Sequence, residues 1–144
     1  MDHEKLSKLL NASNRITVLS TVDPSGAPNS AVFGSVRLLD EKTLLLGMGD
    51  NRSLSNLASN PRGTLLAFIP GSGVFSWRGA RLYLETQKIE ETGPLFESLV
   101  SEVEKTAGRP AAKALKHLVT FRIVNIRPLA DFSFDAPAEP APGG

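Results

Sequence analysis

Apolar and polar positions alternate with a period of two along much of the chain, a pattern typical of β-strands with one buried face. Runs of this kind are rich in leucine or β-branched residues and end at turn residues, so they predict about six strands. The six runs cover residues 14–22, 29–39, 43–48, 63–69, 74–91 and 118–129. Gly34, inside the second run, indicates a bulge or a close approach of another backbone segment.

Other segments carry their apolar residues at helical spacing. Leu6, Leu9 and Leu10 share one face of a short helix predicted over residues 3–12. A second helix is predicted over residues 51–59, with Asp50 or Asn51 as its N-cap and Pro61 just beyond its end. A third amphipathic helix is predicted over residues 93–106, and residues 111–117 indicate a further helical turn.

The connections between the predicted strands are mostly short, and no strand–helix–strand repeat is present. This order favours a small, mainly β, antiparallel barrel with a few short helices (α+β) over a doubly wound parallel sheet. A chain of 144 residues, of which 41% are hydrophobic, is sufficient for one domain with one core. We expect that domain to span residues 1–130. Residues 131–144 are rich in Pro, Ala and Gly and are predicted to form a flexible tail.

Composition excludes several classes of chemistry. The net charge is +1 with acids and bases intermixed, and only 6% of residues are aromatic, so a nucleic-acid partner is disfavoured. The absence of cysteine excludes disulfides, thiolate metal sites and cysteine nucleophiles. His3 and His117 are far apart in sequence, so no metal site is predicted, and His117 is expected at the surface or in a turn.

The sequence also bears on location. No apolar run approaches the length of a membrane span, so no membrane partner is expected. The first ten residues are polar and charged, unlike a signal peptide. These two features together predict a cytoplasmic protein.

The segment "GMGDNRS", residues 47–53, is the strongest candidate for a binding site. Gly47 and Gly49 would let backbone amides approach a ligand, and a helix that starts after Asn51 would present unpaired N–H groups. Arg52 would add a guanidinium, which matches phosphate geometry, and Ser53 a hydroxyl donor. The segment lacks the spacing of a P-loop or of a dinucleotide fingerprint. The alternative is a turn and a helix cap that bind nothing.

The order of motifs along the chain carries further information. The pattern "D-x-x-G-x-P" occurs at Asp23, Gly26 and Pro28, Arg52 and Ser53 follow a third apolar strand, and "N-L-x-x-N-P" follows at residues 56–61. Downstream, residues 75–99 read "FSWRGARLYLETQKIEETGPLFESL". This ordered set resembles the pyridoxamine 5′-phosphate oxidase-like family of FMN-binding split barrels, and among them the small single-domain FMN-binding proteins.

The resemblance implies a six-stranded split β-barrel that forms a homodimer, with one FMN per subunit near the interface. Arg52 and Ser53 occupy the positions of the family's phosphate-binding residues. The backbone of residues 47–49 would pass the cofactor, and residues 30–34 would line the isoalloxazine ring. The cofactor-binding residues expected on this basis are Ser30, Ala31, Val32, Phe33, Gly47, Met48, Gly49, Asn51, Arg52, Ser53 and Trp77.

Trp77 has two interpretations. Its indole could stack on or near the flavin, in its own subunit or the partner's, or it could be a core or interface anchor. No side chain in the sequence stands out as a catalytic acid or base, so no catalytic residue is predicted. In the family that the chain resembles, members that oxidise pyridoxamine phosphate carry additional basic residues for the substrate phosphate and a longer C-terminal segment. This sequence has a Pro-rich tail after its last predicted strand, which argues against that reaction.

Two functions remain open from the sequence. The first is an FMN-binding redox protein that transfers electrons or hydride through the flavin. The second is a non-enzymatic binding module on the same barrel, holding haem, a deazaflavin or another ligand. A haem binder needs an axial ligand, and His117, Met48 and Tyr83 are the candidates, although the predicted elements place none of them well.

Overall fold

The computed structural model describes residues 1–130, so the predicted tail, residues 131–144, lies outside the described residues. It contains seven strands, four α-helices and one 3₁₀ turn. The strands are β1 (Ile16–Val22), β2 (Pro28–Val32), β3 (Val36–Asp40), β4 (Thr43–Met48), β5 (Arg62–Ile69), β6 (Arg78–Glu90) and β7 (His117–Pro128). The helices are α1 (His3–Asn11), α2 (Arg52–Ser59), α3 (Pro94–Ala107) and α4 (Arg109–Ala114), and the 3₁₀ turn is η1 (Val74–Ser76).

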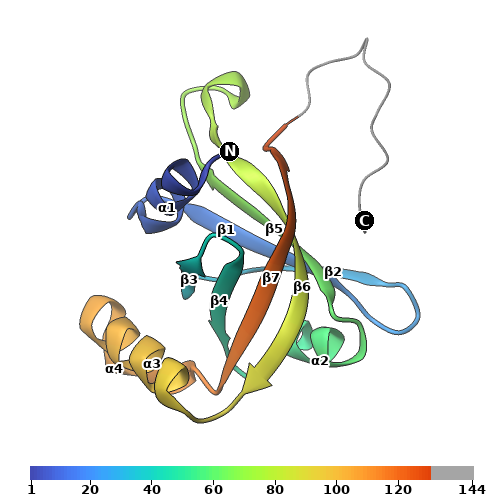
Figure 1. Ribbon diagram of the computed structural model, residues 1–144, viewed down its shortest axis with the longest axis vertical. Coiled ribbons are helices and arrows are strands. Elements are labelled where there is room, and N and C mark those ends of the chain that lie inside the picture. The colour runs from blue at the N-terminus through green and yellow to red at the C-terminus, as the bar shows by residue number, and fades with distance from the viewer. Residues whose placement is uncertain (131–144) are drawn as a thin grey trace.

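All seven strands belong to one sheet in the order β2-β1-β5-β6-β7-β4-β3, and every neighbouring pair is antiparallel. The long strands β6 and β7 cross the molecule and let the sheet curl around a core (Figure 1). Side chains from six strands and from α1 and α2 fill that core. Along the strands, alternate residues face inward. The fully buried members include Leu19, Leu44, Leu65, Leu82 and Phe121.

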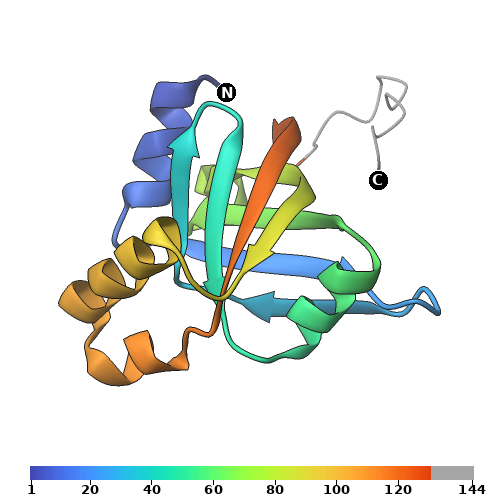
Figure 2. The same cartoon turned by 60° about the horizontal axis from the view of Figure 1, so that its bottom comes forward.

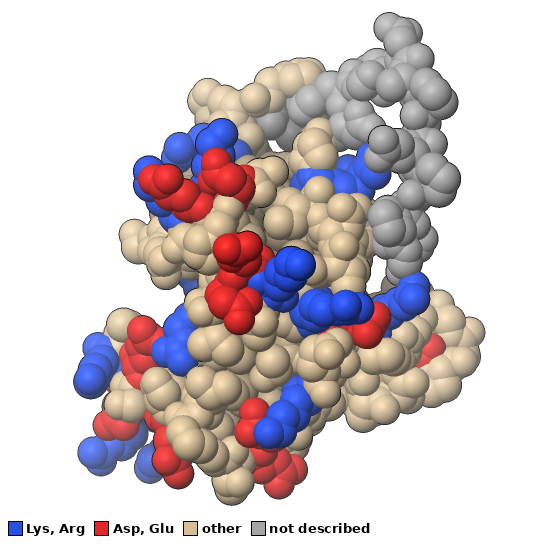
Figure 3. Space-filling model, in the orientation of Figure 1, with Lys and Arg blue, Asp and Glu red and all other residues tan. Residues whose placement is uncertain are grey.

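The helices cover different parts of the sheet (Figures 1 and 2). α1 and α2 lie at opposite ends of the barrel. α3 and α4 pack outside it, where Leu99 forms a second small core with Leu45 and Leu118 of β4 and β7. None of the helices in residues 1–130 is both long and apolar enough to cross a membrane. On the face shown in Figure 3, acidic and basic side chains are intermixed.

The single strand predicted over residues 29–39 is wrong: the structure has two strands there, which brings the total to seven. Side chains donate hydrogen bonds to backbone carbonyls of residues 33–36, where β2 ends and β3 begins. The Arg15 guanidinium donates to the carbonyls of Gly34 (2.9 Å) and Val36 (3.3 Å), and the Thr17 hydroxyl donates to that of Phe33. A Cβ on Gly34 would have no atom within 4 Å, so the predicted close approach there is also wrong.

The long strand predicted from residue 74 begins only at Arg78, because residues 74–76 form η1. Ser76 closes this turn by donating both its N–H (2.9 Å) and its hydroxyl (2.8 Å) to the Gly73 carbonyl. The predicted turn after β1 is confirmed. The Asp23 carboxylate accepts from the N–H groups of Ser25 and Ala27, and Gly26 has a φ of 90°. The hydrogen bond from the Ser25 hydroxyl lowers the pKa of Asp23.

Candidate functional site

The start of α2 is fixed by its cap, as the sequence predicted. The side-chain oxygen of Asn51 accepts from the N–H of Leu54 (2.9 Å), and its carbonyl accepts from that of Ser55 (3.2 Å). The N–H groups of Arg52 and Ser53 belong to the first turn, where a helix offers no internal acceptor. These two backbone donors have no acceptor within residues 1–130, and the positive end of the helix dipole lies at this point.

Side chains add to these donors. Arg52 is exposed, α2 has no acid in its first turn, and the guanidinium forms no ion pair within residues 1–130. Ser53 is 1% exposed, and its hydroxyl lies 3.4 Å from the side-chain nitrogen of Asn29 on β2. That distance corresponds to a weak hydrogen bond, so Asn29 holds the Ser53 hydroxyl only loosely. We call Arg52, Ser53 and Asn29 the α2 cradle.

The α2 cradle is held against the barrel by a buried polar contact. The side-chain nitrogen of Asn56 donates to the Thr21 hydroxyl of β1 (3.0 Å), and both residues are buried. Sequence reasoning missed Asn29, Asn56 and Thr21. The signal for Asn56 was present, since it shares a helical face with Leu57 and Ser53, and a polar residue on a buried face needs a partner.

The predicted ring-lining residues follow the free edge of β2. The Phe33 N–H donates to the Thr17 carbonyl of β1 (3.0 Å). Alternate residues of a strand direct their backbone groups to opposite sides, so Ser30 and Val32 direct theirs away from β1. Within the described chain no other strand pairs with β2. Val32 is 72% exposed, whereas Ala31 and Phe33 are half-buried.

Gly47 and Met48 are engaged inside the protein, whereas Gly49 is half-buried. A Cβ on Gly47 would come within 2.8 Å of a Leu99 methyl and 3.0 Å of a Leu115 methyl, so the glycine lets α3 and the residues after α4 pack on β4. The Gly47 N–H donates to the Ser35 carbonyl, and the Met48 carbonyl accepts from the Lys116 N–H. Met48 is buried in the barrel core. The structure thus shows a packing role for Gly47 and Met48.

His117 is 8% exposed and is the first residue of β7, so the prediction of a surface or turn histidine is wrong. Its Nε2 donates to the Asp50 carboxylate (2.6 Å), and its Nδ1 lies 3.5 Å from a Glu91 oxygen. Asp50 is therefore a partner of His117, whereas Asn51 caps α2. This contact ties the residue before the cap to the start of β7. No group of three or more His, Cys, Asp or Glu in residues 1–130 could hold a metal ion.

Trp77 is not part of the α2 cradle in its own chain. It follows η1 beside the end of β5, whereas Asn56 of α2 contacts the far end of β1. Its ring stacks on Phe68 with centroids 5.2 Å apart and an interplanar angle of 2°.

Comparison with known families fits this arrangement. A family model described as "Pyridoxamine 5'-phosphate oxidase" matches residues 3–130. The chain belongs to this family. Comparison with curated protein sequences gave no significant match.

Solved structures with this family's split-barrel fold include several cofactor-associated proteins. An FMN-binding protein from Syntrophomonas wolfei is 26% identical with a TM-score of 0.80, covering 90% of this chain and 87% of that one. HutZ, the haem storage protein of Vibrio cholerae, is 15% identical with a TM-score of 0.63, covering 88% and 89%. An F420 reductase is 20% identical with a TM-score of 0.62, covering 85% and 94%. The fold is therefore shared by proteins associated with FMN, haem and F420.

Proposed function

We propose that this protein binds FMN and transfers electrons or hydride through it. The observation that carries the proposal is the α2 cradle, where an exposed cation, a hydroxyl and two unpaired backbone N–H groups meet beside the free edge of β2. The Syntrophomonas FMN-binding protein supports the choice of cofactor.

The α2 cradle matches the phosphate of FMN in charge and in hydrogen-bonding type. A phosphate offers several acceptor oxygens and no donor beyond its own proton, and the cradle offers donors. Helix N-termini that present free N–H groups favour such anions. When the phosphate binds, the Ser53 hydroxyl would rotate toward a phosphate oxygen and donate to it, so this buried hydroxyl would keep a hydrogen-bond partner. The Asn29 side chain would then donate to a phosphate oxygen as well.

The free edge of β2 would accommodate the polar edge of the flavin ring. Donors and acceptors alternate along both, and the backbone of Ser30 and Val32 is directed outward. Backbone pairing would explain why the side chains there are small or apolar. When bound, the flavin would supply the redox chemistry, while the protein binds, orients and shields it.

A haem at this site has weaker support. His117 is buried and engaged by Asp50, and Met48 is buried in the barrel core, so neither side chain is free to become an axial ligand. A deazaflavin with a phosphate could use the same α2 cradle and is the main competitor. Titration separates the two cofactors.

An absorption spectrum of the purified protein, followed by titration of any cofactor-free fraction with FMN and with F420, tests the proposal. We expect a bound oxidised flavin spectrum that bleaches on reduction, and tighter binding of FMN than of F420. If the protein is colourless and binds F420 or haem but not FMN, the assignment of FMN as the cofactor is wrong, whereas the fold assignment is unaffected.

We also propose a homodimer formed through the outer face of β2, β1 and β5. Val32, Val18 and Leu66 are cross-strand neighbours and form an apolar row on that face. Within this row Val32 is 72% exposed, so a partner subunit that covered it would bury aliphatic surface and gain hydrophobic stabilisation.

Val32→Asp is expected to convert the dimer to a monomer, because a carboxylate in the middle of an apolar interface has no partner. Sedimentation velocity at micromolar concentration measures the change. Leu39→Asp is the control, since Leu39 is also exposed but lies on β3, the other edge strand. A natural chain that sediments as a monomer with FMN bound would refute the dimer.

A further inference from the structure

His117 is a buried histidine that lies between two carboxylates. It begins β7 and is 8% exposed. Its Nε2 lies 2.6 Å from the carboxylate of Asp50, which belongs to the connection between β4 and α2. Its Nδ1 lies 3.5 Å from a carboxylate oxygen of Glu91, which belongs to the connection between β6 and α3. Two loops that are far apart in the sequence therefore meet at one imidazole ring.

The two nitrogens of this ring have different partners. A carboxylate only accepts hydrogen bonds, so Nε2 carries the proton that Asp50 accepts. Nδ1 is buried and has no hydrogen-bond partner within residues 1–130. In the neutral ring Nδ1 is an acceptor, and it lies beside Glu91, which is an acceptor as well. A second proton would turn Nδ1 into a donor for Glu91 and would give Asp50 a cationic partner.

No other acid competes for this ring in the described part of the chain. Within residues 1–130, no carboxylate besides those of Asp50 and Glu91 lies within 4.0 Å of a His117 nitrogen. The other charged side chains on α2, the near end of β6, α3, α4 and the residue before β7 are paired elsewhere or exposed: Glu90 pairs with Lys88, Glu102 with Arg37 and Glu104 with Arg109, and Arg52, Glu97, Lys105, Lys113 and Lys116 are exposed.

Asp50 lies next to the α2 cradle. It directly precedes the N-cap Asn51, so its Cα is at most about 7.6 Å from that of Arg52. An ionised carboxylate at this point repels a phosphate that binds at the start of α2. Arg52 forms no ion pair within residues 1–130, so it does not neutralise Asp50. A charged His117 would neutralise Asp50 and leave the residues of the cradle unchanged.

We propose that His117 is a positioning residue for the α2 cradle, and that a second proton on its ring strengthens the binding of the FMN phosphate by neutralising Asp50 and engaging Glu91. This inference rests on the proposed FMN site. Histidine is the side chain that ordinarily changes its charge between pH 5 and 8. Each added proton makes the surroundings of the cradle more positive, so the affinity for FMN is expected to rise as the pH falls.

The test is a fluorescence titration of the full, cofactor-free chain with FMN at about pH 8 and at about pH 6.5. We expect the dissociation constant to fall about threefold or more at the lower pH, as one added charge at roughly 8 Å implies. Riboflavin, which lacks the phosphate, should show a much smaller change. A phosphate monoester itself gains a proton near pH 6 and acts in the opposite direction, but equally in every variant.

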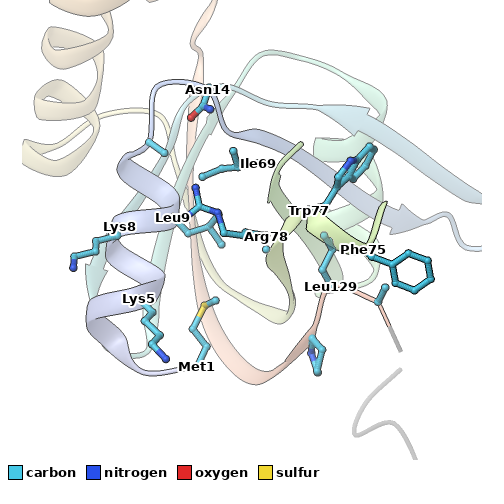
Figure 4. Close-up of a pocket in the computed structure, with 14 residues that line it drawn as sticks. Met1, Lys5, Lys8, Leu9, Asn14, Ile69, Phe75, Trp77, Arg78 and Leu129 are labelled. Atoms are coloured by element: carbon cyan, nitrogen blue, oxygen red, sulfur yellow. The ribbon is translucent and has the colours of Figure 1, made fainter. Parts of the chain in front are cut away.

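His117→Gln is expected to remove the rise in FMN affinity, because glutamine gains no charge in this range. His3→Gln is the matched control and should keep the rise. His3 begins α1, which borders a pocket of about 810 Å³ (Figure 4) and lies at the opposite end of the barrel from α2.

A second variant covers the case in which His117→Gln does not fold, since His117 is buried. Glu91→Gln changes an exposed side chain and removes the acceptor for the second proton, so the rise in FMN affinity between about pH 8 and about pH 6.5 should become smaller. Glu97→Gln makes the same change at an exposed position of α3 and should keep the full rise.

A further readout does not need the cofactor. In the ¹H–¹⁵N NMR spectrum of the cofactor-free chain, the backbone amide signals of residues 51–53 should shift over the same pH range and should stay in place in His117→Gln. If FMN does not bind but these signals behave so, the FMN assignment fails and the coupling of His117 to the start of α2 stands. An FMN affinity or amide signals with the same pH dependence in the natural chain and in His117→Gln would overturn the role of His117, and so would a full rise in Glu91→Gln.

Discussion

Arg52→Ala is expected to weaken FMN binding by about 10- to 150-fold, which corresponds to about 1.5–3 kcal/mol for a hydrogen bond to a charged group. The guanidinium lies on the first turn of α2, where no acid neutralises it, so its positive charge is available to a phosphate. Fluorescence titration of the cofactor-free protein with FMN measures the dissociation constant. The loss is expected to shrink in high salt, since the side chain is exposed.

Arg62→Ala provides the comparison for Arg52→Ala. Arg62 is an exposed arginine at the start of β5, so the variant loses the same charge at a different place. Its affinity for FMN should stay within about twofold of the natural chain, because exposed charges at a distance are screened. Equal losses of FMN affinity in the two variants would indicate a general effect of charge. An unchanged FMN affinity in Arg52→Ala would mean that Arg52 is a solvated surface residue with no role in binding.

Gly79→Ala is expected to lower the free energy of unfolding by about 3 kcal/mol, at the upper end of the usual range for overpacking. A Cβ at this position would lie 2.2 Å from the Ala67 carbonyl oxygen and 2.8 Å from the Phe68 Cα. These atoms belong to the backbone of β5, so the β5–β6 ladder would have to separate locally. Urea unfolding measures the effect as a midpoint that falls by about 1–3 M.

The control for Gly79→Ala is the same substitution at Gly34. A Cβ on Gly34 would have no atom within 4 Å, and its φ is not positive. Gly34→Ala should therefore be neutral or stabilise by up to about 1 kcal/mol, because alanine restricts the unfolded chain. Similar losses in both variants would mean that backbone freedom matters at these glycines and that the contact between β5 and β6 does not.

The fold class and most elements could be predicted because their causes are local. Asn51 caps α2 through a hydrogen bond to a residue three positions later, and the turn after β1 is closed by Asp23 and residues up to four positions away. Strand alternation is likewise visible within a few residues. The ordered motifs then indicated the family, which the match over residues 3–130 confirmed.

The errors occurred where distant residues decide. Where β2 ends and β3 begins, Arg15 donates to carbonyls 19 and 21 residues away, and no pattern within residues 29–39 reveals this contact. His117 is buried at the start of β7 and contacts Asp50, which lies 67 residues earlier, so no local pattern around His117 reveals its environment. Gly47 likewise packs against methyl groups of the distant residues Leu99 and Leu115, and its contact with a cofactor stays a prediction.

The candidate site also combines features set by nearby residues with features set by distant ones. The sequence by itself determined a helix start with a free cation at Arg52 and a hydroxyl at Ser53, because capping and helix geometry are local. Only the tertiary structure decided that Asn29 meets Ser53, that Asn56 is tied to Thr21, and that Trp77 lies near the other end of β1. Such contacts depend on how strands pair and on how helices pack over them, and neither is encoded within a short stretch of the chain.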